Sequence, residues 1–368
     1  MQYQTDHRIV ATLDAGGTNF VFGAIQGGEY IMGPHSLPAM ADDLDACLGQ
    51  LFKGFDMLFC DKHRKPIAIS FAFPGPADYP RGIIGGFLPN FPSFREGVAL
   101  GPLLEHRYGV PVFINNDGDL FAYGESLCGF LPEINNRLAE LGAVKRFYNL
   151  IGYTVGTGLG IGIVVNGHLN RGDNSCVETF CLPHPDMPNI IIEEGASTRA
   201  VCRVYSEITG ENVSQTDARN IAEIAEGNIP GNPEAARKAF ATMGKTLGEA
   251  IATSATLIDG LIVIGGGVMK AKKWIMPALM QALQKTLRTM KGENVNRMQM
   301  KVYDLDNPEN FEEFAHGEVK RIKVYGQERY VDYDVQKRIG IGISRMGANK
   351  AVSVGAYVFA LNQLDGID

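Results

Sequence analysis

One pattern occurs twice in this chain and constrains the fold more than any other feature. An apolar segment, a glycine-containing turn and a second apolar segment meet in residues 14–27, and the same layout recurs in residues 154–167. The two copies share few identical residues, although Gly16 aligns with Gly156. Strand-like and helix-like segments alternate around both copies, which is typical of α/β folds with largely parallel sheets. The pattern therefore predicts two α/β halves with a ligand at the mouth of a cleft between them.

Glycine is the one unusual component of the composition. The chain has 44 glycines among 368 residues, well above the usual share of roughly 7%. Glycine lets the backbone approach a ligand closely. The hydrophobic share of 45% and the charged share of 20% exclude disorder, collagen and coiled coil. The length fits two domains or one deeply clefted body. A net charge of -7 excludes a basic nucleic-acid footprint, so phosphate binding would have to use local backbone geometry.

Three observations predict a cytoplasmic protein. The six cysteines form no CxxC pair, and we interpret them as free thiols in a reducing compartment. The polar N-terminal residues run into a predicted strand, so we expect no signal peptide. No apolar run approaches the length of a membrane-spanning helix.

The first candidate site is the turn Asp14-Ala-Gly-Gly-Thr-Asn. A turn between antiparallel strands can direct successive N–H groups at an anion. Gly16 and Gly17 would let a phosphate approach, and Thr18 and Asn19 would add side-chain donors. Asp14 would hold a hydrated Mg²⁺ against those phosphates. The alternative is a plain hairpin turn, in which Asp is favoured for its local hydrogen bonds.

Two further glycine segments follow predicted strands. Neither belongs to a GxxxxGK[ST] or GxGxxG motif, so a Walker loop and a dinucleotide-binding fingerprint are both excluded. Taken singly, each segment fits a tight turn or close strand–helix packing. Three such loops in a repeated α/β pattern favour a nucleotide site instead. The residues concerned are Gly156, Thr157, Gly158, Gly265, Gly266 and Gly267.

The segment Asn115-Asn116-Asp117-Gly118 follows the predicted strand PVFI. An aspartate at the carboxyl end of a strand lies where ligands bind in α/β sheets. Asp117 would accept a proton from a substrate hydroxyl as its oxygen attacks phosphorus. Alone, this segment would more simply be a turn, since Asn-Asp-Gly is a strong turn signal.

Together these motifs resemble the ROK family of sugar kinases, within the hexokinase/actin/Hsp70-like ATPase superfamily. The resemblance covers residues 8–290 and 340–362. The matching segments, in chain order, are Asp14–Asn19, Phe73–Pro76, Pro89-Asn90, Asn116-Asp117 with Gly124-Glu125, Gly156–Gly158 and Gly265–Gly267.

The resemblance implies an α/β, two-lobed, actin-like ATPase (ribonuclease H-like) fold with duplicated α/β domains around a cleft. We expect an N-terminal lobe of residues 1–115 and 350–368. A C-terminal lobe would span residues 116–349, with an inserted hairpin or surface excursion at about 300–338.

The resemblance also implies roles for individual residues. Asp117 would be the general base, while Asn90, Asn116, Glu178 and Glu193 would bind the sugar. A slip of one residue toward Glu194 stays open. The glycine segments listed above, with Asp14, Thr18 and Asn19, would bind ATP and Mg²⁺, and the family implies a homodimer.

The sequence departs from the family at two places. The GH dipeptide of the family is Phe180-Cys181 here, so the sugar-binding and often zinc-ligating histidine is missing. Whether His184 replaces it stays open. The family's CxCGxxGC cluster is also absent, and we predict no zinc site.

The expected reaction is ATP-dependent phosphorylation of a hexose at its 6-hydroxyl. N-acetylhexosamine kinase and fructokinase activities are the alternatives within the same chemistry, because the sequence does not identify the sugar. A non-catalytic sugar sensor or a ROK-type regulator is the alternative class. The regulator is disfavoured because the first motif begins at residue 14, ahead of which we expect no helix-turn-helix domain.

Overall fold

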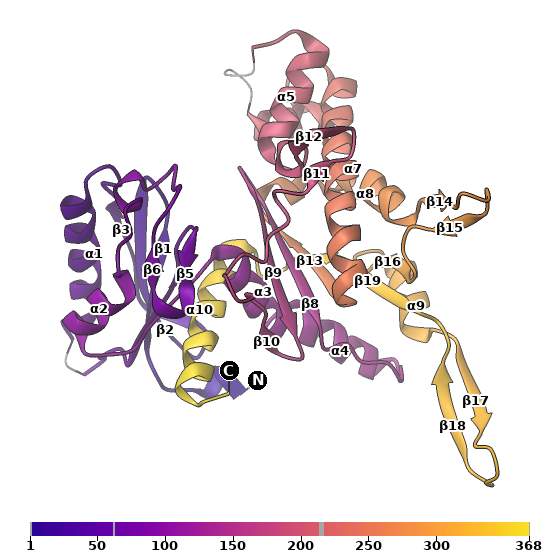
Figure 1. The fold of residues 1–368 in the computed structure, drawn as a ribbon, viewed down its shortest axis with the longest axis horizontal. Helices are drawn as coiled ribbons and strands as arrows, with labels where there is room; N and C mark the ends of the chain where they lie inside the picture. The colour runs from indigo at the N-terminus through magenta and orange to yellow at the C-terminus, as the bar shows by residue number, and fades with distance from the viewer. Residues whose placement is uncertain (1, 62, 213–216, 368) are drawn as a thin grey trace. The chain divides into compact units, whose positions relative to one another are not determined.

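The structure is a computed structural model that describes residues 2–61, 63–212 and 217–367. It is a mixed α/β protein, as predicted, and divides into two compact units (Figure 1). Unit 1 comprises residues 1–129, 162–177 and 346–368, and unit 2 comprises residues 130–161 and 178–345. This division differs from the predicted lobes, because the helix that begins at Asp117 packs within unit 1 rather than with the chain that follows it.

Unit 1 is built on a five-stranded sheet with the order β3-β2-β1-β4-β7. The first three strands are antiparallel neighbours, whereas β1, β4 and β7 run parallel. Helix α1, Leu44–Phe59, begins at the capping residue Asp43, and α2, Leu100–Tyr108, ends at Gly109 in the left-handed conformation. The strands are β1 (Val10–Ala15), β2 (Asn19–Gln26), β3 (Glu29–Pro38), β4 (Ala68–Ala72) and β7 (Val112–Asn115).

A cluster of aromatic side chains fills the core of unit 1. Phe55 of α1 packs edge-on against Phe22 of β2, with ring centroids 5.2 Å apart. Phe73 lies 4.7 Å from Phe91 and 5.2 Å from Phe94. All five rings are completely buried. The short elements that supply the rest of this region are η1 (Gln2–Thr5), β5 (Ala77–Asp78), η2 (Tyr79–Arg81), β6 (Ile83–Ile84) and η3 (Pro92–Phe94).

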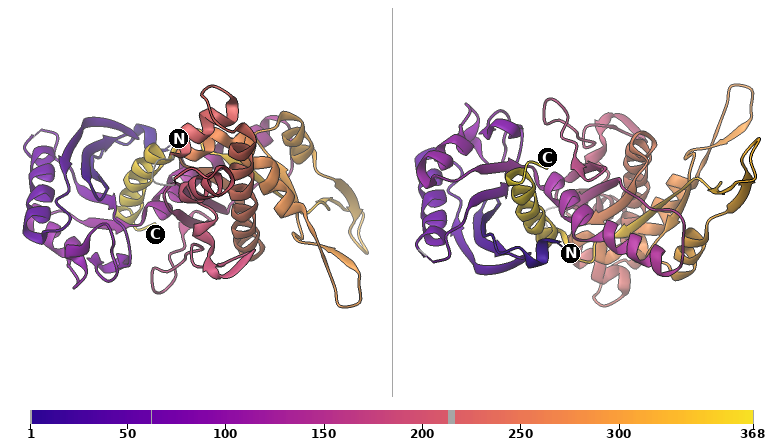
Figure 2. Two further views of the ribbon diagram at one scale, coloured as in Figure 1. Left: turned by 90° about the horizontal axis from the view of Figure 1, so that it is seen from above. Right: turned by 90° about the horizontal axis from the view of Figure 1, so that it is seen from below.

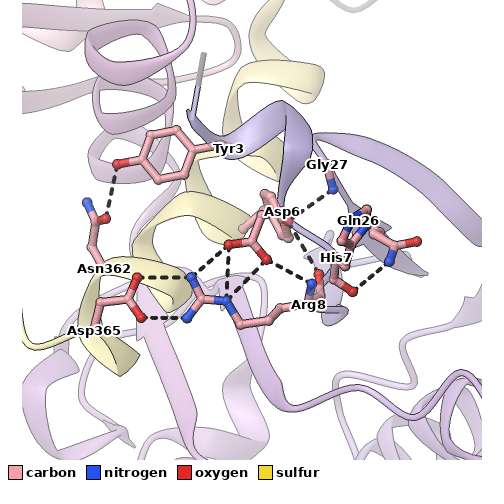
Figure 3. Close-up of polar contacts among 9 residues, drawn as sticks. Tyr3, Asp6, His7, Arg8, Gln26, Gly27, Asn362 and Asp365 are labelled. Atoms are coloured by element: carbon pink, nitrogen blue, oxygen red, sulfur yellow. Dashed lines mark hydrogen bonds and ion pairs between the residues drawn. The ribbon is translucent and has the colours of Figure 1, made fainter.

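The C-terminal helix α10, Ala348–Leu364, returns to unit 1 and packs on α3, Asp117–Leu127. The end of α10 is also tied to the N-terminal segment (Figure 3). There the Arg8 guanidinium donates to the carboxylates of both Asp6 and Asp365, and these contacts hold the pKa of each carboxyl below its usual value. Tyr3 donates to Asn362 at 3.0 Å.

A six-stranded sheet has the order β10-β9-β8-β13-β19-β16. Its first strands reproduce those of the first sheet, since β8 (Leu150–Val155) and β9 (Leu159–Val165) start 140 residues after β1 and β2. The repeat seen in the sequence is therefore confirmed as a repeat of structure. The division between the units falls within β9. The remaining strands of this sheet are β10 (His168–Leu169), β13 (Leu261–Gly265), β16 (Lys301–Asp304) and β19 (Arg338–Ile343).

The helices of unit 2 include the pair α7, Pro233–Ile258, and α8, Lys272–Gln284, which pack on each other. Gly244 and Gly248 of α7 face the backbone of α8, and a side chain at either position would collide with it. The other elements are α4 (Phe130–Glu140), β11 (Pro183–His184), β12 (Met187–Ile191), η4 (Ile192–Glu194), α5 (Thr198–Thr209), α6 (Ala218–Glu226) and η6 (Gly267–Ala271).

The predicted excursion at about 300–338 is only in part a surface feature. Strand β16 joins the sheet beside β19, and α9, Pro308–His316, buries Phe311 and Phe314. Only the strands β17 (Val319–Lys323) and β18 (Tyr330–Asp334) form an exposed hairpin. This hairpin and a second one, β14 (Thr286–Arg288) with β15 (Asn294–Asn296), project from unit 2 (Figures 1 and 2).

No helix within the described residues is long and apolar enough to cross a membrane.

Candidate functional site

The first glycine turn lies at the exposed end of β1. Asp14 pairs with Val21 and Ala15 with Phe20, so residues 16–19 close the hairpin and face solvent. Gly17 lies against the loop that carries Asn90, and a Cβ at residue 17 would stand 2.9 Å from the Asn90 Cβ. Gly17 therefore brings the first phosphate motif and the predicted sugar-side residue together.

Strand register places Asp117 near this turn. Across the parallel strands β1, β4 and β7, Asp14 is level with Ala72, and Ala72 is level with Asn115. Asp117 follows two residues after Asn115, at the first position of α3. The two carboxyls are close enough that Asp117 raises the pKa of Asp14, although burial contributes more to that shift. Asp14 and Asp117 thus lie at the carboxyl ends of neighbouring parallel strands in unit 1, and the loop of Asn90 reaches the same turn through Gly17.

Asn116 has a structural role in addition to its predicted sugar contact. It is the N-cap of α3, and its Oδ1 accepts a hydrogen bond from the Asp119 N–H at 2.5 Å. This cap fixes the first turn of α3 and with it the backbone that carries Asp117.

The sequence analysis missed a polar network behind Asp117. Asp119, in the first turn of α3, is only 3% exposed. Arg171 attracts it electrostatically and donates from Nη1 to the Asn115 Oδ1 at 3.0 Å. The Arg171 guanidinium also lies over the Phe359 ring, with its Cζ 5.4 Å from the ring centroid. Asp119 directly follows the quoted Asn-Asp-Gly segment, whereas nothing near Arg171 in the sequence distinguishes it from other arginines.

The three aspartates share a direction of pKa shift. The pKa of Asp117 is raised because protein atoms surround its carboxyl, even though the residue is accessible to solvent, and backbone N–H groups partly oppose this shift. Burial raises the pKa of Asp119 to about 7. The positive charge of Arg171 partly opposes this rise, and the negative charge of Asp117 adds to it. A carboxyl with a raised pKa is a better proton acceptor near neutral pH.

Stability should depend on pH through Asp119. The native state holds the Asp119 proton up to about pH 7, whereas the unfolded state releases it near 3.8, the ordinary pKa of an aspartate. The native state therefore loses stability as pH rises between these two values. Asparagine does not titrate, so Asp119→Asn should remove this loss. The free energy of unfolding of the variant, relative to that of the wild type, should therefore be higher at about pH 8 than at about pH 5. Urea unfolding at both pH values measures the difference, and parallel pH dependences would contradict the assignment.

The second and third glycine segments meet in unit 2. Strands β8 and β13 are parallel, with Gly265 opposite Thr154. Gly266 has a positive φ of 113°, and a Cβ there would stand 2.0 Å from the Val155 carbonyl oxygen. Only glycine allows this approach. The Gly156 N–H donates to the Gly158 carbonyl at 3.0 Å and closes the second loop.

Glu193 contacts the second loop directly. Its Oε2 accepts the Leu159 N–H at 2.9 Å and lies 2.9 Å from where a Gly158 Cβ would be. Its Oε1 accepts from Arg199 at 2.7 Å, and the same Arg199 nitrogen reaches Glu194 at 3.0 Å. Both oxygens of Glu193 therefore have protein partners.

Glu178 lies near the buried Tyr153, whose pKa is raised to about 12, mainly by burial and in smaller part by Glu178. His184 is 4% exposed in the β11–β12 hairpin. Its Nδ1 accepts the Asp186 N–H at 3.2 Å, and its ring packs where Gly195 leaves room. Burial lowers the pKa of His184 and favours the neutral ring. A packed, buried imidazole therefore lies in this hairpin.

No group of three or more His, Cys, Asp or Glu side chains within the described ranges is arranged to hold a metal ion. The absence of zinc stays a prediction. All six cysteines are free.

A cavity of about 530 Å³ opens in unit 2 beside α8, whose first residue follows η6 and the third glycine segment. Its size is that of a small-molecule pocket. Its apolar lining comes from Met276, Pro277 and Met280 of α8. The polar lining includes Lys272, Lys273, Gln284, Asp304, Asp306, Asn307 and Asn310.

Comparison with known proteins places this geometry in a family. The sequence model of the ROK family matches residues 10–307. The chain is 54% identical to a solved structure named glucokinase from Parabacteroides distasonis, with a TM-score of 0.90, over 98% of this chain and 99% of that one. It is similar in fold to a ROK family glucokinase from Streptomyces griseus in complex with glucose and AMPPNP, at 18% identity and a TM-score of 0.58, over 95% and 98% of the two chains.

Among curated proteins, the chain is 35% identical to the xylose repressor of Bacillus subtilis over 106 residues. That match covers 29% of this chain and 23% of the repressor, so the chain spans about a quarter of that relative's length.

Proposed function

Because the chain belongs to the ROK family, we propose that it is a sugar kinase that transfers the terminal phosphoryl group of ATP to the 6-hydroxyl of a hexose. The fold is that of the actin-like ATPases. The observation that carries the proposal is the register of β1, β4 and β7, which gathers Asp117 beside Asp14 and the first glycine turn. The 54% identity to a protein named glucokinase supports glucose as the first sugar to test.

Asp117 would act as the general base. Asp117 is an exposed residue whose carboxyl has a raised pKa, so it suits the removal of a proton from a sugar hydroxyl. The proton would move to an Asp117 oxygen as the sugar oxygen attacks phosphorus. Asn90, Asn116 and Glu178 would bind the other hydroxyls, because polyols need several fixed hydrogen-bonding groups. The resemblance implies the same role for Glu193.

The glycine turns would bind the phosphates. The exposed backbone of Gly16, Gly17, Thr18 and Asn19 would offer N–H groups in unit 1, and the loop at Gly156, Thr157 and Gly158 would do so in unit 2. Asp14 lies close to a second carboxyl, and a divalent cation would relieve this repulsion. We therefore propose that Asp14 holds Mg²⁺ through water. The ion would neutralise charge on the transferring phosphoryl group.

The cavity beside α8 would take the adenosine end of ATP, with Gly265, Gly266 and Gly267 ahead of η6 and α8 in the chain. Its apolar lining suits a flat purine, and its polar lining offers partners for the ribose. Replacing Met280, which belongs to the apolar lining, by tryptophan should fill the cavity. We expect the KM for ATP to rise about 10-fold or more, while the KM for the hexose stays within about 2-fold.

Initial rates at varied ATP and fixed hexose, and the reverse, measure the two constants of the Met280→Trp variant. A rise confined to the hexose KM would contradict the placement of adenosine in this cavity. Leu257, an exposed apolar residue of α7 in the same unit, offers a control in Leu257→Trp, which adds the same ring away from the cavity.

A coupled-enzyme assay with glucose, mannose, fructose, N-acetylglucosamine and N-acetylmannosamine tests the function. Turnover with glucose or mannose supports a hexose 6-kinase, and a preference for fructose or an N-acetyl sugar would select one of the alternatives. Sugar binding without turnover on any sugar would instead indicate a sensor, the class that the repressor match favours.

We also propose a cytoplasmic homodimer. The six free cysteines agree with a reducing compartment. Light scattering after gel filtration tests the oligomeric state.

A further inference from the structure

Arg171 acts on the chain on both sides of Asp117. Its Nη1 donates to the Asn115 Oδ1 at 3.0 Å, two residues before Asp117. Its positive charge also attracts the carboxylate of Asp119, two residues after Asp117. Asn115 ends β7, and Asp119 lies in the first turn of α3. One guanidinium therefore spans the junction at which the strand passes into the helix.

Both partners of Arg171 are buried. Asn115 is completely buried and Asp119 is 3% exposed. Because an arginine side chain carries only donors, Asn115 must turn its Oδ1 toward Arg171. The Asn115 Nδ2 has no hydrogen-bond partner among the described residues, so the bond from Arg171 orients this side chain. Without Arg171, a buried acceptor would lose its donor and a buried carboxyl would lose a neighbouring cation, and the chain would have to move to solvate them.

The fold holds Arg171 itself in place. Arg171 lies just after β10, and the Asn170 N–H donates to the Ile163 carbonyl at 2.8 Å, which ties the preceding residue to β9. The Arg171 Cζ lies 5.4 Å from the ring centroid of Phe359 in α10, a distance at which the cation and the aromatic face attract each other. Arg171 is thus fixed independently of the junction that it contacts.

Strand β9 packs against the same junction at a second point. A Cβ at Gly162 of β9 would stand 2.1 Å from the Gly118 carbonyl oxygen and 2.7 Å from the Ala122 Cβ. The backbone directly after Asp117 therefore lies against β9. Asp117 is an exposed residue, whereas Gly118 is buried. The direction of the Asp117 carboxylate therefore depends on how the backbone on either side of it is held.

We propose that Arg171 is a positioning residue for phosphoryl transfer: by binding Asn115 and facing Asp119, it holds the turn that carries Asp117 and so directs that carboxylate toward the substrate hydroxyl. This inference rests on the proposed function, since it takes Asp117 as the general base. Arg171 acts through the backbone at this turn. A displacement of about 1 Å in a reacting group can lower the rate by about 10²-fold, so a residue in this place can control turnover.

The first test separates kcat from the KM for ATP. Arg171→Met keeps an apolar stem beside Phe359 and removes the charge and the donors. Its kcat should fall about 10- to 100-fold, while its KM for ATP should stay within about 2-fold, because the glycine turns are untouched. Arg171→Lys should recover part of the kcat, since lysine keeps the charge and a donor but lacks the planar fork. Initial rates with the sugar that is turned over fastest measure both constants, and thermal unfolding shows whether each variant is folded.

Arg107→Met is the matched control. The Arg107 Cζ lies 4.5 Å from the ring centroid of Phe52, and its Nη2 donates to Asp56 at 2.8 Å. The substitution therefore removes the same kinds of contact from the same unit, but between α1 and α2 rather than at the start of α3. It should leave kcat within about 2-fold of the wild type.

Amide hydrogen exchange gives a second readout that needs no turnover. The N–H groups of Asp119 and Leu120 both bond to Asn116 at the start of α3. In Arg171→Met these amides should exchange about 10-fold faster or more, while the amides of α1 keep their wild-type rates. Mass spectrometry of peptic peptides measures both segments. Arg107→Met should leave the start of α3 unchanged.

Faster exchange confined to the start of α3 supports the positioning role even if no sugar in the panel is phosphorylated and the proposed activity fails. Equal acceleration throughout unit 1 would overturn it, because Arg171 would then contribute only to general stability. A kcat of Arg171→Met within about 2-fold of that of an active wild type would overturn it as well, whatever the exchange rates.

Discussion

Replacing Asp117 by asparagine should lower kcat by about 10²- to 10⁴-fold, the usual contribution of a positioned general base. Asparagine has nearly the same shape as aspartate but cannot accept the proton. Asp117 is an exposed residue at the first position of α3, so the substitution should disturb little packing. The KM for ATP and for the hexose should change much less than kcat, because the loss falls on the transition state.

The Asp117→Asn experiment needs a control that reproduces its structural side effect. A carboxylate in the first turn of a helix typically stabilises it by about 0.3–1 kcal/mol, and this is lost in Asp117→Asn. Asp45 occupies the first turn of α1 in the same unit and is exposed. Asp45→Asn should therefore cost similar stability and leave kcat unchanged. A near-normal kcat for Asp117→Asn would refute the assignment of the base.

The pH dependence of the wild-type rate provides an independent check. Asp117 must be deprotonated to accept a proton, and its pKa is raised above the usual value for aspartate. The value of kcat/KM should therefore fall on acidification at a higher pH than an ordinary carboxyl would allow. Any activity that survives in Asp117→Asn should have lost this acidic limb.

The sequence predicted the parts of the site that depend on local pattern. Glycine turns at strand ends can be seen in the sequence, and parallel strands bring their carboxyl ends to one edge of a sheet. Asp14 and Asp117 are separated by about a hundred residues, yet the alternation of strands and helices was enough to place both at such an edge. The repeat of β1 and β2 in β8 and β9 was predicted for the same reason.

The sequence did not predict features that depend on contacts between distant segments. Nothing near Arg171 shows that it binds Asn115, and nothing near Arg199 shows that Glu193 touches the loop at Leu159. Residues 301–316 are rich in charge, so we interpreted them as a surface excursion. Their buried residues, such as Phe311 and Phe314, are too few to outweigh the charged neighbours in a sequence pattern.

Replacing Gly355 by alanine should destabilise unit 1 by roughly 1–3 kcal/mol or more, the usual cost of overpacking. Helices α3 and α10 cross at backbone distance. A Cβ at Gly355 would stand 1.9 Å from the Leu120 carbonyl oxygen, and one at Gly124 would stand 2.2 Å from the Ala351 carbonyl oxygen. Both obstacles are backbone atoms, so no side chain can rotate away, and α10 would have to move off α3.

Gly49→Ala is the control, because the same substitution is expected to change stability in the opposite direction there. Gly49 also lies inside a helix of unit 1, α1, but a Cβ there would meet nothing within 4 Å. Alanine should stabilise that helix by about 0.5–1 kcal/mol, because glycine loses more conformational freedom on folding. Denaturant unfolding should thus move the two midpoints in opposite directions. Since α3 begins with Asp117, Gly355→Ala should also lower kcat even where the protein stays folded. Equal unfolding midpoints for the two variants would show that α10 does not pack on α3 at backbone distance.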